Sequence, residues 1–232
     1  MPDSPPSSSS SVDSANASSG LSEPDVDPEQ VERRFPYSAE LKRKALHLVA
    51  LVVPLGMHLL GRTDALWMLV PSSIFAVGAD VLRAYSSAFN AHIQHIFGPL
   101  MRTEELRAPG EGVVLNGATS VLVGAALLTV LFPLSIAVAV FVMTMTADAA
   151  AALVGRAIGH HRWPGRTHTV EGTAAFVTVG MLVMMPFGLG LPGTTSGVLV
   201  AAIAEASPLP VNDNIAVPLL AAMAVTLVGW YV

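Results

Sequence analysis

The chain has 232 residues, of which 52% are hydrophobic and 12% are charged, and that charged fraction is about half of what soluble domains usually carry. It contains no cysteine, so disulfides, thiolate metal sites and cysteine nucleophiles are excluded. The composition argues against a soluble enzyme, a nucleic-acid-binding protein and a coiled coil. The length allows one polytopic membrane domain of roughly six or seven helices, at about 20 residues per span.

Residues 1–39 differ from the rest of the chain. Nine of the first twenty residues are serine, and the segment carries seven acidic and two basic side chains. The whole net charge of −5 belongs to it, because residues 40–232 hold ten acids and ten bases. A segment with so little apolar surface does not offset the entropy of ordering, and it lacks the basic start and apolar core of a signal peptide. We expect a disordered tail at 1–39 and one transmembrane domain at 40–232.

Seven apolar segments follow the tail, and they predict an all-α polytopic membrane protein with about seven transmembrane helices. The segments are 44–60, 65–83, 113–132, 134–154, 171–189, 194–207 and 215–232. Pro133 and the pair Pro192-Gly193 are expected to mark tight turns between neighbouring helices. The stretch 85–100 is interpreted as an interfacial helix, which we favour over a metal site at its His92 and His95.

The basic side chains predict an orientation. If residues 42–44 lie in the cytoplasm and the segments alternate, eleven of the twelve bases fall on the cytoplasmic side and only Arg62 falls outside. This pattern predicts a multi-pass protein of the cell inner membrane with an external C-terminus. In this orientation most polar residues of the spans lie at the cytoplasmic face, where a soluble molecule and a lipid can both reach them. These residues are Glu40, His47, Asp80, Asn116, Thr119, Asp148, Glu171, Glu205, Asp213 and Asn214.

The stretch 146–172 holds the strongest candidate site. Asp148 lies on an otherwise apolar helix, where a carboxylate is costly unless it is paired or binds metal. Asp148 and Glu171 are hard oxygen ligands of the type that Mg²⁺ takes beside nucleotide phosphates. The stretch also supplies glycines, which let a backbone approach a phosphate, and arginines, which bind phosphate oxygens: Gly155, Gly159, Arg156, Arg162 and Arg166.

Structural interpretations stay open for the same residues. The three arginines are also typical of a positive-inside loop. An ion pair between packed helices would account for Asp148, and the helix dipole would favour Glu171 at a helix N-terminus. His160 and His161 are interpreted as loop residues, because adjacent side chains do not face one site on a helix.

Two further elements flank this stretch. The first, at the membrane entry, combines ordinary basic anchors with an acid one turn before and a histidine one turn after them: Glu40, Arg43, Lys44 and His47. The second is Asp213-Asn214 after Glu205, a pair that most simply caps a helix. The sequence has no P-loop of the GxxxxGK type.

These motifs, in this order, resemble those of the CTP-dependent polyprenol, phytol and diacylglycerol kinases, which are distant relatives of phosphatidate cytidylyltransferases. The membrane entry resembles their E-x-x-R-K-x-x-H start, and 115–133 is similar to their next helix. Residues 148–159 resemble their D-a-x-A-x-x-x-G-x-x-x-G segment, and 169–172 their Ser/Thr-Leu-Glu-Gly box. Glu205 with Asp213-Asn214 and Pro218 resembles their last element. The resemblance spans residues 40–220.

The resemblance implies a membrane lipid kinase that transfers the γ-phosphate of CTP, with Mg²⁺, to an isoprenoid alcohol or diacylglycerol. It implies catalytic and metal-binding roles for Asp148 and Glu171. It implies nucleotide or phosphate binding by a larger set: Arg43, Lys44, His47, Gly155, Arg156, Gly159, Arg162, Arg166, His168, Asp213 and Asn214.

Two positions depart from the family pattern. His168 stands where the family usually has lysine, and Ala147 stands where glycine is usual. An imidazole is mostly neutral at pH 7, so Arg166 is the candidate substitute for that lysine. Two other functions stay open: a phosphatidate cytidylyltransferase, and a small ion-coupled transporter that uses Asp148 and Glu205.

Overall fold

The computed structural model describes residues 45, 47–98, 101, 105–163 and 168–229, all within the second of the two units into which the chain divides, 37–232. The predicted tail at 1–39 lies outside the described residues. So do four residues of the predicted motifs: Glu40, Arg43, Lys44 and Arg166.

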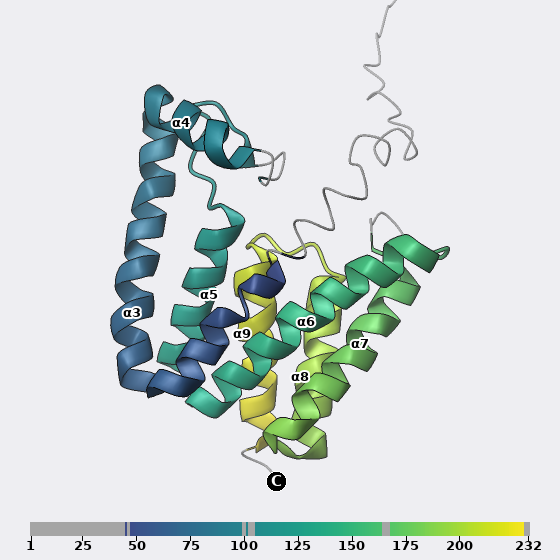
Figure 1. The fold of residues 1–232 in the computed structure, drawn as a ribbon. Coiled ribbons are helices and arrows are strands. Elements are labelled where there is room, and N and C mark those ends of the chain that lie inside the picture. Colours follow the sequence, from purple (N-terminus) through teal and green to yellow (C-terminus); the bar gives the residue numbers. More distant parts are fainter. Residues whose placement is uncertain (1–44, 46, 99–100, 102–104, 164–167, 230–232) are drawn as a thin grey trace, which may run out of the picture. The chain divides into compact units, whose positions relative to one another are not determined.

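The described residues form an all-helical structure, as the sequence predicts, with no strand beyond one isolated bridge. Figure 1 shows the arrangement. The elements are α3 (Val52–Tyr85), α4 (Ser87–Phe97), α5 (Gly117–Leu131), α6 (Leu134–Ile158), α7 (Val170–Met184), the 3₁₀ turn η3 (Met185–Phe187), α8 (Gly190–Glu205) and α9 (Asp213–Gly229).

Helix α3 contains the predicted span 65–83 and the second half of the predicted span 44–60. It breaks at Gly61, whose φ of 79° and ψ of 174° are not helical and are accessible mainly to glycine. Figure 1 shows two segments that meet in a sharp turn at this point. The turn is fastened to the end of α5, because the Arg62 guanidinium donates a hydrogen bond of 2.7 Å to the carbonyl of Val130.

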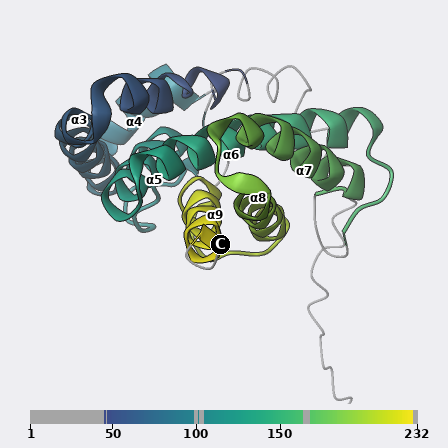
Figure 2. The same ribbon diagram turned by 90° about the horizontal axis from the view of Figure 1, so that it is seen from below.

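Helix α6 is the central element of the bundle, in contact with α3, α5, α7, α8 and α9. Apart from a few polar residues such as Asp148, its side chains are mostly apolar, which is typical of a helix in the interior of a bundle. Phe141 and Met143 are fully buried. In Figure 2, α8 and α9 lie side by side, and both pack against α6.

Three helical stretches in the described part of the chain are long and apolar enough to cross a membrane: His47–Tyr85, Leu134–Ile158 and Val170–Phe187. The shorter helices α5 and α9 are also apolar. Large apolar side chains face outward along α3, where Trp67 is 77% exposed and Phe75 is 80% exposed. An apolar outer surface of this kind is suited to a bilayer rather than to water.

Two predicted boundaries are wrong in an informative way. Pro192 and Gly193 lie inside the first turn of α8, where a missing N–H costs nothing. The turn before α8 is instead made by Gly188 and Gly190, with φ of 70° and 71°. Residues 113–116 are not helical, because the Asn116 side chain caps α5 by accepting a hydrogen bond of 2.9 Å from the N–H of Thr119.

Candidate functional site

A small cavity lies where the sequence motifs from both ends of the domain meet. Its volume is about 30 Å³, which holds a water molecule or an ion but not a nucleotide. The polar part of its lining comes from the short helical segment before α3, from α6, and from the end of α8 and the start of α9: His47, Thr144, Asp148, Glu205, Asp213 and Asn214. Apolar residues close the rest: Met145, Phe176, Val217 and Pro218.

Asp148 and His47 are paired in this cavity. The Nε2 atom of His47 lies 3.3 Å from Oδ2 of Asp148, and the two side chains are 14% and 23% exposed. A carboxylate so far along an apolar helix is stabilised by such a partner. A paired imidazole and carboxylate can also take up and release a proton, which is the usual equipment of general base catalysis.

Asp213 and Asn214 line the cavity, and the residue before them caps α9. The Asn212 side chain accepts the N–H of Asn214 at 3.0 Å, and the Asn212 carbonyl accepts the N–H groups of Ile215 and Ala216. The structural interpretation of Asp213-Asn214 as the cap is therefore wrong, since Asn212 fills that role. Two polar side chains at the start of α9 instead line the cavity.

Gly124 on α5 is a site residue that the sequence interpretation missed. A Cβ at this position would lie 2.4 Å from the backbone oxygen of Asn214, closer than real Cβ atoms approach. That oxygen has no partner four residues on, since Pro218 has no N–H. The only signal in the sequence was one glycine inside an apolar segment.

The predicted phosphate-binding glycines lie at a close crossing of α6 and α7. A Cβ on Gly155 or Gly159 would lie 2.8 Å or 2.7 Å from Oγ1 of Thr169, and one on Gly172 would lie 2.9 Å from the Ala151 carbonyl oxygen. Packing alone therefore requires small residues here. Their predicted role in phosphate binding stays a prediction.

The described residues at the two ends of the connection between α6 and α7 are paired with each other. Arg162 and Thr169 form the isolated antiparallel bridge, and the N–H of Trp163 donates to the His168 carbonyl at 3.1 Å. Arg156 and Arg162 are exposed, while His168 is half-buried. The predicted basic groups of this segment thus lie at the end of α6 and along the connection.

Glu171 lies in a different environment from Asp148. Its Oε1 atom is 2.6 Å from Nδ1 of His161, and it does not line the cavity. Gly172 packs against Ala151 and Gly155, which follow Asp148 on α6 by three and seven residues, or roughly 5 to 10 Å at the rise of an α-helix. The two carboxylates predicted as a metal pair thus have different partners, His47 for Asp148 and His161 for Glu171.

The donors of the cavity nevertheless suit Mg²⁺. The part of the chain that the structure describes contains no cluster of three or more His, Asp or Glu side chains placed to hold a metal. Mg²⁺ usually needs only one or two carboxylates when substrate phosphates supply further oxygens. Asp148 and Asp213, which both line the cavity, are carboxylates of this kind, and the metal-binding role of Glu171 stays a prediction.

A second polar cluster joins the end of α3 to the start of α5. Asp80 and Arg83 are 3% and 6% exposed and lie 3.6 Å apart. The backbone and side-chain nitrogens of Asn116 each donate to Asp80 at 2.9 Å, and Arg83 donates to the Val114 carbonyl at 3.2 Å. Every oxygen of Asp80 therefore has a partner within the chain.

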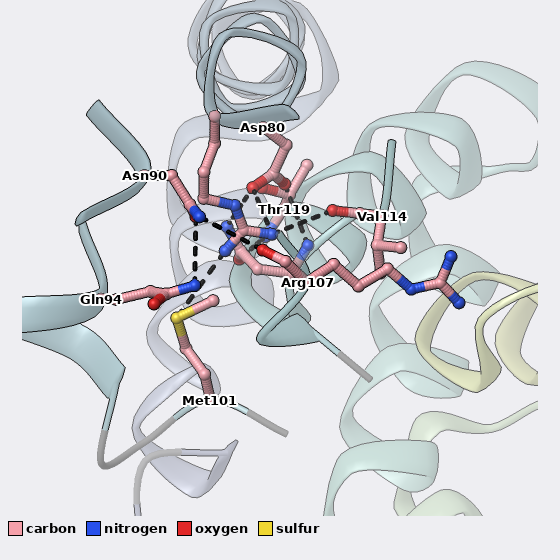
Figure 3. Close-up of polar contacts among 9 residues, drawn as sticks. Asp80, Asn90, Gln94, Met101, Arg107, Val114 and Thr119 are labelled. Carbon is pink, nitrogen blue, oxygen red and sulfur yellow. Dashed lines mark hydrogen bonds and ion pairs between the residues drawn. The ribbon is translucent and has the colours of Figure 1, made fainter. Parts of the chain in front are cut away.

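Figure 3 shows how α4 and the following segment close over this cluster. Asn90 donates to the Arg107 carbonyl at 3.2 Å and accepts from Gln94 at 3.3 Å. The guanidinium of Arg107 points away from the cluster in this view. The sequence grouped Asp80, Asn116 and Thr119 with the candidate site, but the structure places them in this separate, structural cluster.

Comparisons with known proteins leave the family open. No family model matches the chain, and no solved structure matches it. The chain is 22% identical over 199 residues to Uncharacterized protein RP860 of Rickettsia prowazekii (strain Madrid E), a match that covers 82% of this chain and 95% of that protein.

Proposed function

We propose that the chain is a membrane lipid kinase that transfers the γ-phosphate of CTP to a lipid alcohol, either an isoprenoid alcohol or a diacylglycerol. The observation that supports this proposal is the cavity between α6 and α9. Its polar lining is drawn from three motifs that resemble those of CTP-dependent lipid kinases, and these motifs are far apart in the sequence: His47, Asp148, Glu205, Asp213 and Asn214.

The chemistry follows from these groups. The hydroxyl oxygen of the lipid attacks the γ-phosphorus, the bond from that phosphorus to the bridging oxygen breaks, and CDP leaves. The hydroxyl proton passes to His47, and Asp148 stabilises the resulting imidazolium. Mg²⁺ neutralises phosphate charge when it is bound with CTP, and Asp148 and Asp213 would hold it. Since the cavity is too small for CTP, the nucleotide lies at its mouth.

The apolar helices support a location in the membrane, and we propose seven spans with the cavity on the cytoplasmic side. Seven helical segments support this number: the two halves of α3, and α5 to α9. Introduced cysteines test the orientation, because the native chain has none. His160→Cys should react with an impermeant reagent only after the inner face is opened, and Thr63→Cys should react in intact cells. The reverse pattern contradicts the proposal.

Labelled nucleotides test the reaction. The purified full-length chain is incubated with CTP labelled in the γ- or α-phosphate, and with a panel of lipid alcohols and phosphatidate. The kinase predicts that γ-label enters a lipid alcohol while α-label stays in CDP. Entry of α-label into phosphatidate, with pyrophosphate released, identifies the cytidylyltransferase instead. Absence of both transfers, together with ion flux in proteoliposomes that depends on Asp148 and Glu205, identifies the transporter.

A further inference from the structure

Thr144 is a polar residue of the cavity lining that the proposed reaction does not use. It lies on α6, is 5% exposed, and borders the cavity together with Asp148. It also lies outside the sequence motifs that resemble those of lipid kinases. Its hydroxyl is therefore a buried polar group of the cavity without an assigned role.

The hydroxyl hydrogen of Thr144 is directed at the backbone of its own helix. Oγ1 donates to the carbonyl of Val140 at 3.0 Å and to that of Phe141 at 3.2 Å. A threonine hydroxyl has a single hydrogen and two acceptor lone pairs. Because the two carbonyls take the hydrogen, the hydroxyl can act toward the cavity only as an acceptor. An acceptor oxygen suits a cation, and it does not suit a phosphate oxygen.

Thr144 and Asp148 share one face of α6. They are four residues apart in the sequence, which on an α-helix places their Cβ atoms about 5–6 Å from each other. Both border the same cavity, of about 30 Å³, which has room for one ion or one water molecule. Mg²⁺ binds oxygen ligands at about 2.0–2.1 Å. A hydroxyl oxygen and a carboxylate oxygen on neighbouring turns are therefore able to share one such ion.

Thr146 has the same hydrogen bonds as Thr144 in a different place. Its hydroxyl donates to the carbonyls of Val142 at 2.8 Å and Met143 at 3.1 Å. Two residues along an α-helix correspond to a rotation of about 200°, and Thr146 is not among the described residues that line the cavity. The two threonines thus differ in their position relative to the cavity and not in how they bond to α6.

We propose that Thr144 is a Mg²⁺ ligand, whose hydroxyl oxygen shares with Asp148 the ion that the cavity holds. The identity of the ion rests on the proposed function, since CTP-dependent phosphoryl transfer uses Mg²⁺ to neutralise phosphate charge. The assignment of Thr144 rests on its hydrogen bonds and on the cavity. The two proposals can therefore fail independently.

Manganese binding tests the assignment without any activity. Mn²⁺ takes the same hard oxygen ligands as Mg²⁺, and the electron paramagnetic resonance signal of free Mn²⁺ measures how much is bound to the full chain in detergent. Thr144→Val keeps the shape of the side chain and removes the oxygen, so it should raise the Kd for Mn²⁺ about tenfold. Thr144→Ala should raise it as much, whereas Thr144→Ser keeps the oxygen and should stay within about twofold of the wild-type Kd.

Thr146→Val is the matched control, because it removes the same pair of hydrogen bonds from α6. It should leave the Kd for Mn²⁺ unchanged. Asp148→Asn identifies the site, since Mn²⁺ binding at the cavity should be lost in this variant. A wild-type Kd in both Thr144→Val and Thr144→Ala overturns the proposal. So does an equal rise of the Kd in Thr144→Val and Thr146→Val, or a wild-type chain without Mn²⁺ binding that depends on Asp148.

Lipid phosphorylation separates a failure of this assignment from a failure of the proposed function. Thr144→Val should need about tenfold more Mg²⁺ for half-maximal activity, whereas Thr144→Ser and Thr146→Val should need the wild-type concentration. If Thr144→Val weakens Mn²⁺ binding but the wild-type chain phosphorylates no lipid, the ligand assignment stands and the proposed function fails. If the wild-type chain phosphorylates a lipid and Thr144→Val binds Mn²⁺ with the wild-type Kd, the proposed function stands and Thr144 is not a ligand.

Discussion

Asp80 and Asp148 are both acids on apolar helices, but their surroundings differ. Asp80 is 3% exposed, and Asn116 and Arg83 use both of its oxygens. Asp148 is 23% exposed and lines a cavity beside His47. Asp80 also borders a small cavity, of about 10 Å³, but Asn116 and Arg83 use its oxygens to hold α3 against α5. Asp148 borders the larger cavity, of about 30 Å³. A carboxylate in a span is thus a better candidate for chemistry when it borders a space that can hold an ion.

The largest expected effect comes from Asp148→Asn, which keeps the shape of the side chain and removes its charge. Phosphoryl transfer should fall by about 10²- to 10⁴-fold, the range for loss of a general acid–base group. The melting temperature in detergent should change by less than about 2 °C. CTP-dependent lipid phosphorylation and thermal unfolding are measured on the same preparation. An Asp148→Asn variant with wild-type activity removes Asp148 from the catalytic machinery.

Asp80→Ala should produce the opposite result, a large loss of stability. It leaves Arg83 buried without its carboxylate, and breaking a buried pair in this way costs about 3–5 kcal/mol. Thermal unfolding in detergent measures the loss. Asp64→Ala is the matched control, since Asp64 is an exposed acid on the same helix and its removal should change stability little. Equal melting temperatures for the two variants would contradict the structural role of Asp80.

Gly124→Ala tests whether packing of α5 against α9 shapes the cavity. The new methyl group meets the Asn214 carbonyl oxygen at 2.4 Å, so the start of α9 has to move, at a cost of about 1–3 kcal/mol. Both the melting temperature and the kinase activity should fall. Gly78→Ala, where a Cβ meets nothing within 4 Å, should leave both unchanged or slightly raise stability. The two variants behaving alike would show that Gly124 does not position Asn214.

The smallest expected effect is that of His168→Lys, which introduces the residue that the resembled family usually has. A lysine ammonium is a compact positive charge that can pair with a phosphate. Activity should therefore stay the same or rise. CTP-dependent phosphorylation of a lipid alcohol by the variant and by the wild-type chain measures the difference. A folded but inactive His168→Lys variant would show that His168 has its own role.

The helices were predictable because each requires only local information. Apolar segments of sufficient length predict spans, and all seven predicted segments correspond to helical segments in the structure. Boundaries were less predictable, because they depend on single caps. Asn116 caps α5 and Asn212 caps α9 through their side chains. The sequence pattern predicts neither of these caps.

The partners of the polar residues were only partly predictable. The sequence gathered His47, Asp148 and Asp213 at one face, and the structure brings them to one cavity. It also paired Asp148 with Glu171, whereas the structure pairs Asp148 with His47 and Glu171 with His161. The spacing of residues in the sequence predicts how far along a helix each residue lies. Which residues on different helices come into contact depends instead on how the helices pack against each other.

The break at Gly61 has a consequence for how the protein is made. It joins two helical segments through a short turn, and in the proposed seven-span arrangement these two segments would enter the bilayer as a hairpin before α6 has been synthesised. About one hundred residues separate His47 from Asp148 in the sequence, so His47 is synthesised well before its partner. Asp213 and Asn214 come later still. The cavity is therefore one of the last features to form during biogenesis, and a nascent chain that stops before α9 carries helices but no complete site.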